Sequence, residues 1–268
     1  MQPSTAILVR VGRVCYALAI AGIGFQLFFY GEFHPVIFPA WPGIPVLRFW
    51  VYAAGTLLIA ASLAILLNKN GRKVSLLLGA FLFVLLCFGH IPYEFIIDPN
   101  SKHHLGLWTN ALKELALSGG AFVIAGSFTS AFPKPVAVKL LEKVIPAGPV
   151  FFSITMICFG IGHFMYIQFV SLLVPGWVPD PIFWTYLAGV ALIAAGIAII
   201  LEIRVRRIGI LLGAMIFLWL ILLHLPSSVA NPFGDKGNEV TSAYTALAFS
   251  GIAFVIAGMQ HTKKDSLS

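Results

Sequence analysis

The sequence predicts an all-α, polytopic membrane protein with eight transmembrane helices arranged as two parallel four-helix repeats. Three observations lead to this fold class. Apolar residues make up 59% of the chain and charged residues only 10%, whereas a soluble domain carries about 25% charged residues. The apolar residues form continuous runs of about 20, the length that a helix needs to cross the hydrocarbon of a bilayer. The second half of the sequence also repeats the first.

The apolar runs are continuous and lack the period-two alternation that a transmembrane β-barrel requires. A helix satisfies its own backbone hydrogen bonds in lipid, so helices are the structure that these runs favour. The fourth and eighth runs begin with more polar residues than the others. We expect helices at residues 11–30, 48–67, 73–91, 108–128, 147–170, 183–203, 206–225 and 239–259.

The repeat aligns residues 50–92 with residues 184–226, and each copy ends its third apolar run with a His-x-Pro motif. Four crossings return a chain to its starting side, so both copies insert in the same sense, and their symmetry axis lies along the membrane normal. We expect a first transmembrane module at residues 1–132, a cytoplasmic linker at 133–146 and a second module with a short tail at 147–268.

The distribution of basic residues predicts the orientation. Most lysines and arginines lie on the side of the termini and of the linker, and only Arg48, Lys102 and Lys236 lie in the opposite loops. Cytoplasmic loops carry the excess of Lys and Arg, so we expect both termini in the cytoplasm, in a bacterial plasma (inner) membrane. The net charge of +7 is explained by this bias and by anionic headgroups. A nucleic-acid partner is therefore not expected.

His90 and His224 occupy matched positions at the ends of the third and seventh runs. An imidazole at such a place can relay protons, ligate a metal ion or haem, or donate a hydrogen bond to a quinone carbonyl. The simpler interpretation is a histidine that bonds to a neighbouring loop while Pro92 and Pro226 end their helices. The residues that would complete a metal site cannot be identified, so no metal ligands are predicted.

Lys113 and Glu114 are ionisable residues inside the fourth run, where the second copy has a threonine and an alanine. A charged group at membrane depth costs roughly 2.5 kcal/mol or more on insertion scales, so each needs a partner or a wet cavity. Adjacent helical residues point about 100° apart, and the two therefore do not pair with each other. Either Glu94 or Glu32 would serve Lys113 in a polar pocket. The alternative is a Lys113 side chain that reaches the interface near the helix start.

Trp41 and Trp177 each follow a proline, after the first and fifth runs respectively. Tryptophan prefers the headgroup boundary, and proline interrupts a helix. The segments are thus either capped helix ends with an interfacial anchor or re-entrant loops that cover a pocket between the halves. The three cysteines are isolated in or beside apolar runs and lack Cys-x-x-Cys spacing, which disfavours a paired-cysteine redox mechanism.

These motifs together resemble the DoxX/DoxD superfamily of membrane proteins. The resemblance rests on the Gly-Ile-Gly turn, the Pro-x-Trp exit, the Trp-x-Tyr-x-Ala-Gly start of the second run, the His-x-Pro motif and the Asn110-x-x-Lys113-Glu114 stretch. It covers two fused modules, at about 11–128 and 147–259. The second module departs from the pattern, with Ser242 and Thr245 in place of Asn110 and Lys113. The resemblance implies a four-helix module linked to quinone-dependent sulfur oxidation or to membrane redox complexes.

We therefore expect a membrane subunit of a redox complex that handles quinone and protons near the outer surface. A quinone is favoured over haem or a metal ion as cofactor, and the partners would be the lipid bilayer with a redox subunit or a second copy of the chain. The chain lacks a cofactor motif, which counts against an independent enzyme. The alternatives are a small-molecule transporter or channel with a site between the repeats, and a non-catalytic scaffold. The expected working residues are His90, Glu94, Lys113, Glu114 and His224, with His90, His224, His163, Trp41 and Trp177 around the cofactor.

Overall fold

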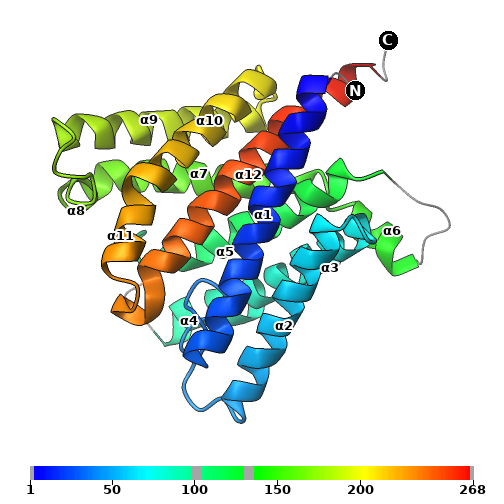
Figure 1. Ribbon diagram of the computed structural model, residues 1–268, viewed down its shortest axis with the longest axis horizontal. Helices are drawn as coiled ribbons and strands as arrows, with labels where there is room; N and C mark the ends of the chain where they lie inside the picture. Colours follow the sequence, from blue (N-terminus) through cyan, green and yellow to red (C-terminus); the bar gives the residue numbers. More distant parts are fainter. Residues whose placement is uncertain (1–2, 98–103, 130–135, 266–268) are drawn as a thin grey trace.

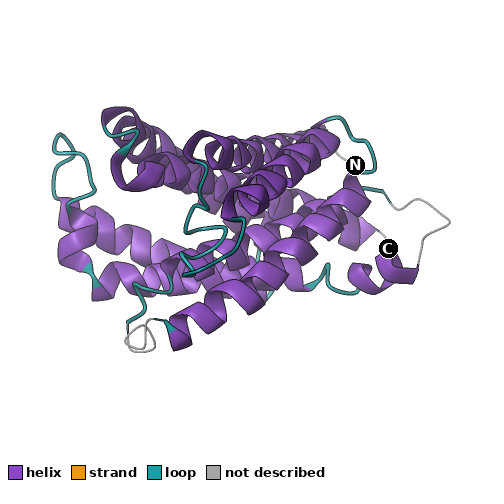
Figure 2. Ribbon diagram, turned by 90° about the horizontal axis from the view of Figure 1, so that it is seen from below, coloured by secondary structure: helices purple, strands orange, loops and turns teal. Residues whose placement is uncertain are grey.

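The computed structural model describes residues 3–97, 104–129 and 136–265, and this part of the chain is built from helices and loops without a β-strand (Figure 2). The helices are α1 (Pro3–Tyr30), α2 (Leu47–Leu66), α3 (Gly71–Leu85), η1 (Leu86–His90), α4 (Ile91–Ile96), α5 (Thr109–Ser127), α6 (Val136–Glu142), α7 (Ala147–Met165), α8 (Ile167–Ser171), α9 (Pro181–Ile200), α10 (Val205–Trp219), η3 (Leu220–His224), α11 (Leu225–Ala230), η4 (Gly234–Gly237) and α12 (Asn238–Asp265).

Seven helical segments in the described residues are long and apolar enough to cross a membrane. Their outer faces carry large apolar side chains that no other part of the protein covers, for example Phe29 (70% exposed) and Leu211 (67% exposed). Lipid is the medium in which such a surface is stable, and the predicted multi-pass helical membrane protein is confirmed. The segments are Thr5–Tyr30, Leu47–Leu66, Gly71–Ile96, Ala147–Met165, Pro181–Ile200, Val205–Ala230 and Gly234–Met259.

The fourth predicted segment forms α5, which is not among these seven apolar helices. Its sequence carries Lys113 and Glu114 and is rich in small residues, so its mean hydropathy is lower. Most of its side chains are buried inside the protein instead. The position of α5 in the interior therefore explains why its surface need not match lipid.

Helices from the two halves of the sequence pack against each other. α1 and α12 lie side by side across the centre of the molecule (Figure 1), and α5 packs in the same way against α7. Glycines allow both approaches: a Cβ on Gly12 would stand 2.4 Å from the carbonyl oxygen of Gly251, and one on Gly119 would stand 2.7 Å from that of Gly148. Small residues permit such close packing in membranes. The segments predicted as two modules therefore share one core.

Within each half, the first helix packs on the second and the third on the last. The pairs are α1 with α2 and α3 with α5 in the first half, and α7 with α9 and α10 with α12 in the second. The linker forms α6, which the ion pair of Arg72 with Glu142 (2.5 Å) joins to α3. Cys15, Cys87 and Cys158 are free thiols.

The two His-x-Pro motifs lie in matching π-helical turns. η1 ends at His90 and η3 ends at His224, and after each turn the backbone N–H bonds to the carbonyl five residues earlier. Proline has no N–H and its ring clashes with the carbonyl four residues before it, so Pro92 and Pro226 disfavour a regular α-helix here. Single π-turns occur often at functional sites, and these two set the direction of both imidazoles.

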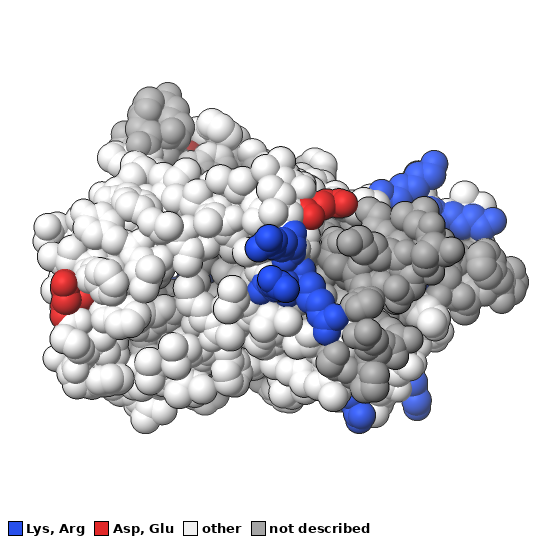
Figure 3. Space-filling model, turned by 90° about the horizontal axis from the view of Figure 1, so that it is seen from above, with Lys and Arg blue, Asp and Glu red and all other residues white. Residues whose placement is uncertain are grey.

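The termini lie at one end of the molecule (Figures 1 and 2). Lysines and arginines lie at the centre and toward that end of the face seen in Figure 3, and the far end of the same face shows none. Among the exposed residues at this end are Lys73, Lys139, Arg204 and Arg207.

Candidate functional site

A cavity of about 480 Å³ lies among α5, α7, α8, α9, α10, η3 and α12. Its wall is mainly apolar and aromatic, and buried residues such as Met156 and Phe249 form its inner part. The exposed lining residues Gly106, Phe169 and Leu173 place its opening beside α8 and the start of α5. A mainly apolar pocket with a few polar groups is the usual form of a small-molecule site.

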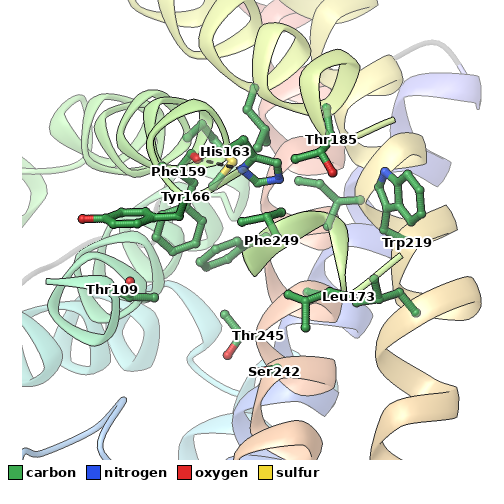
Figure 4. Close-up of a pocket in the computed structure, with 18 of the residues that line it drawn as sticks. Thr109, Phe159, His163, Tyr166, Leu173, Thr185, Trp219, Ser242, Thr245 and Phe249 are labelled. Atoms are coloured by element: carbon green, nitrogen blue, oxygen red, sulfur yellow. Dashed lines mark hydrogen bonds between the residues drawn. The ribbon is translucent and has the colours of Figure 1, made fainter. Parts of the chain in front are cut away.

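His163 on α7 brings an imidazole to the wall of this cavity (Figure 4). Its Nδ1 lies 2.8 Å from the carbonyl oxygen of Phe159. A carbonyl only accepts hydrogen bonds, so Nδ1 carries the proton and Nε2 is the acceptor in the neutral ring. Figure 4 shows the ring extending toward Thr185, with Ser242 and Thr245 on the α12 side of the cavity. The wall thus offers both donors and acceptors to a bound molecule.

Lys113 on α5 also lines the cavity, so the first half of the chain contributes a charged residue to a pocket of the second. The carboxylate that acts on it electrostatically is Glu239 on α12. No carboxylate in the described residues lies within 4 Å of its ammonium group. The predicted pairing with Glu32 is wrong, because Glu32 forms an ion pair with Lys236 near the surface. Lys113 therefore keeps donors available to a ligand.

His224 lines the same cavity, and its Nδ1 is buried without a hydrogen-bond partner in the described residues. Its positive neighbour is Lys113. The residue of the second copy that aligns with Glu114 is Ala246, which also lines the cavity. Because Ala246 stands where the first copy has Glu114, no carboxylate meets His224 from this position, and its imidazole faces the cavity.

His90 and Glu114 form a buried contact next to the cavity, outside its lining. Nε2 of His90 lies 2.8 Å from Oε2 of Glu114, and the two side chains are 1% and 0% exposed. The N–H direction does not meet hydrogen-bond geometry, so none of the four polar atoms has a well-aligned partner in the described part of the chain. Cys87 adds an electrostatic contact to Glu114. The pair can hold one proton between a carboxylate and an imidazole.

The remaining predicted residues are distributed unevenly. Glu94 is buried at the start of α4. The indole of Trp41 donates to the carbonyl oxygen of Gly89 (3.0 Å) and its ring packs edge-on against Tyr93. Trp177 is 70% exposed and is not among the residues that line the cavity. The structure therefore gathers Lys113, His163 and His224 at the cavity, sets His90 and Glu114 beside it, and leaves Trp177 outside.

The segment 31–46 fills the first half in the place where the second half has its cavity. Its residues Val36 and Ile37 are fully buried, and Phe38 lies against the flat face of Gly89. The aligned residue of the second copy is Leu223, which lines the cavity. The leucine side chain occupies the space that Gly89 leaves open in the first half. The corresponding loop of the second half, residues 172–180, therefore cannot enter there as Phe38 and Trp41 do.

Replacement of Gly89 by leucine is expected to displace Phe38 and to destabilise the first half. A Cβ at Gly89 would stand 2.5 Å from the Phe38 ring, and overpacking of this kind costs about 1–3 kcal/mol. Thermal unfolding in detergent would show a lower midpoint for Gly89→Leu. Gly176→Leu is the matched control, since a Cβ there meets no atom within 4 Å. Equal midpoints for the two variants would contradict this role of Gly89.

His34, in the loop after α1, was not singled out by the sequence, yet it is 4% exposed. Its Nδ1 accepts a hydrogen bond from the backbone N–H of Val36 (3.3 Å), and its Nε2 is buried without a partner in the described residues. Burial, assisted by the positive charge of Lys113, lowers the pKa of His34 from 6.5 to about 4. The sequence feature that could have indicated His34 is its place between the first apolar run and the prolines Pro35 and Pro39.

We expect the stability of the protein to fall on acidification because of His34. His34 binds a proton near pH 6.5 in the unfolded chain and only near pH 4 in the folded chain. Its neutral form therefore contributes fully to the stability of the folded state above pH 6.5, and this stability is lost as the pH falls toward 4. The shift corresponds to about 3 kcal/mol. Unfolding midpoints between pH 7 and pH 4 would measure it. His34→Asn keeps an acceptor without this titration, and an unchanged pH dependence in that variant would contradict the assignment.

Comparison of the chain with protein families, curated proteins and solved structures finds no match. The resemblance to the DoxX/DoxD superfamily stays a prediction. In the described residues, no three His, Cys, Asp or Glu side chains are grouped so that they could hold a metal ion.

Proposed function

We propose that this chain is a DoxX-like membrane subunit that binds a quinone in the cavity and handles protons beside it. The observation that carries the proposal is one apolar and aromatic cavity on whose wall Lys113, His163 and His224 meet. Quinone carbonyl oxygens accept hydrogen bonds, which the ammonium group of Lys113 and the imidazole of His224 can donate. A quinone tail is apolar and suits the opening beside Phe169 and Leu173.

The chain's own residues would bind and orient the quinone and supply protons to it. A bound quinone supplies the capacity to carry two electrons and two protons, and the electrons would come from a partner redox subunit. Lys113 and His224 would donate to the carbonyl groups and orient them, and Nε2 of His163 would accept a hydrogen bond from a hydroxyl group of the reduced form. His90 and Glu114 would hold a proton one residue away from Lys113 along α5, in a site that lipid and protein shield from water.

The arrangement that we propose has eight crossings in two parallel four-helix repeats, with α5 as the eighth. The internal sequence repeat, the two matched π-turns and the termini at one end support it. The basic residues at that end support an orientation with both termini in the cytoplasm of a bacterium, and a site that opens toward the outer surface.

The test is the binding of a short-tailed benzoquinone analogue to the purified protein. Quinones quench tryptophan fluorescence on contact, and Trp184 and Trp219 both line the cavity with ring centroids 6.4 Å apart. We expect saturable quenching that Trp219→Phe reduces and that Trp50→Phe, on the exposed surface, leaves in place. Quenching that rises linearly with the analogue and is the same in both variants would refute the proposal.

A small-molecule carrier is the second candidate, because helices of both halves form the cavity wall: α5 from the first, and α7, α8, α9, α10, η3 and α12 from the second. Movement of the halves against each other would change access to such a site. Uptake of a weakly acidic solute into proteoliposomes that depends on Lys113 and is insensitive to quinone analogues would favour the carrier. If neither uptake nor quinone binding is found, the scaffold interpretation is favoured over both.

A further inference from the structure

A second hollow, of about 440 Å³, lies at the end of the molecule that carries the termini. It is formed by the first turns of α1, the end of α2 with the residues that follow it, and the end of α5. Its polar lining includes Arg10, Arg13, Asn68 and Ser127, and none of the described residues that line it is acidic. The hollow is therefore a positively charged recess.

Arg13 is held in place on one side only. Its Nε donates to Oγ of Ser127 (2.8 Å), a second N–H donates to the Ser127 carbonyl oxygen, and its guanidinium carbon lies 3.7 Å from the ring centre of Phe128. A guanidinium has five N–H donors, so about three remain for a ligand. Because the group is already ordered, binding an anion would order little more of the side chain.

Arg10 lies one helical turn before Arg13 and lines the same hollow, with its side chain exposed. Within the described part of the chain, no carboxylate lies within 4 Å of either arginine. The nearby acidic residue Glu142 is already paired with Arg72. In the described residues these two arginines have no counter-ion, so an anion from outside the protein can neutralise them.

The rim of the hollow is apolar. Val14 and Leu66 line it and are 38% and 37% exposed, and the neighbouring Leu67 is 62% exposed. Val14 and Leu66 belong to the exposed apolar surface of the spanning segments Thr5–Tyr30 and Leu47–Leu66, and Leu67 follows the second segment directly. A molecule that fits both the two arginines and the apolar rim has an anionic head and an apolar tail.

We propose that this hollow binds the phosphate head group of an anionic phospholipid, with Arg10 and Arg13 as its ligands and Val14 and Leu66 against its acyl chain. Arginine suits phosphate because its planar group donates two parallel hydrogen bonds. Basic pockets between transmembrane helices bind anionic head groups in this manner. The site is separate from the cavity of the proposed function and does not depend on it.

The experiment is native mass spectrometry of the full chain after exchange into mixed phosphatidylglycerol and phosphatidylcholine. We expect the wild type to retain phosphatidylglycerol over phosphatidylcholine by at least tenfold, and Arg10→Gln to reduce this preference about fivefold or more. Arg10 makes no described ion pair, so this variant should fold. Val14→Trp would block the acyl groove and lower retention by a similar factor with both arginines intact.

Arg207→Gln is the matched control, because Arg207 is an exposed arginine at the same end that does not line the hollow. It should bind as the wild type does. Equal losses in Arg10→Gln and Arg207→Gln would indicate general surface charge and overturn the proposal. So would displacement of the lipid by millimolar inorganic phosphate, which would show a free-anion site, or equal retention of the two lipids.

Discussion

Replacement of Lys113 by methionine is expected to weaken binding of the short-tailed quinone analogue by about 10- to 100-fold. Lys113 is the one lysine or arginine among the described residues that line the cavity. A hydrogen bond from a charged donor contributes about 1.5–3 kcal/mol, and each 1.4 kcal/mol is a factor of ten in affinity. Methionine keeps an unbranched apolar chain of similar length, so the cavity wall is preserved. Titration of tryptophan fluorescence would measure the dissociation constant.

The same substitution is not expected to lower the unfolding midpoint, because removal of a charge from the interior removes its desolvation cost. Lys236→Met is the control, since Lys236 and its partner Glu32 are 60% and 51% exposed and such surface pairs contribute little. Equal affinities for the wild type and Lys113→Met would show that the cavity does not use this ammonium group. The proposed function would then lose its main residue.

Single replacements of His90 or Glu114 by leucine are expected to destabilise the protein more than replacement of both together. Each single variant leaves one polar group, 1% or 0% exposed, without its partner. Loss of one member of a buried ionisable pair costs about 3–5 kcal/mol, whereas apolar replacement of the whole pair is often nearly neutral. We therefore expect a double variant with a midpoint close to that of the wild type.

The measurement is a double-mutant cycle of unfolding midpoints or free energies in one detergent. Residues in contact show coupling energies of about 0.5–3 kcal/mol, and distant residues add independently. A coupling of zero would mean that the 2.8 Å contact between His90 and Glu114 contributes nothing to stability. The pair Lys236→Met and Gly176→Leu, at separate surface positions, should be additive and supplies the reference.

Several parts of the fold were predictable because they depend on local properties of the chain. Hydropathy summed over about 20 residues identifies a membrane helix, and seven of the predicted segments met that criterion. The fourth segment did not, because the buried position of α5 allows residues that lipid would exclude. The expectation that Pro92 and Pro226 end their helices was wrong. Each helix continues through a π-turn into α4 or α11, which accommodates a proline without ending the helix.

The candidate site was predictable only in its residue types. The sequence pointed to Lys113, Glu114, His90, His163 and His224 because ionisable groups at membrane depth need a reason to be there. It did not show that His90 meets Glu114 while Lys113 enters a cavity of the other half. The first contact depends on the packing of η1 against α5, and the entry of Lys113 into the cavity depends on the close approach of α5 to α7, which Gly119 and Gly148 permit.

By itself, the sequence determined that this protein is helical, is embedded in a membrane and contains a duplication. Composition, the length of the apolar runs and self-similarity are properties of the chain alone. Only the tertiary structure decided how the differences between the two copies change the packing of each half. Gly89 lets Phe38 and Trp41 fill the first half, whereas Leu223 and Ala246 leave a cavity in the second. The reason is physical: a few ångströms of side-chain volume decide whether a space is filled, and those distances exist only after the helices have packed.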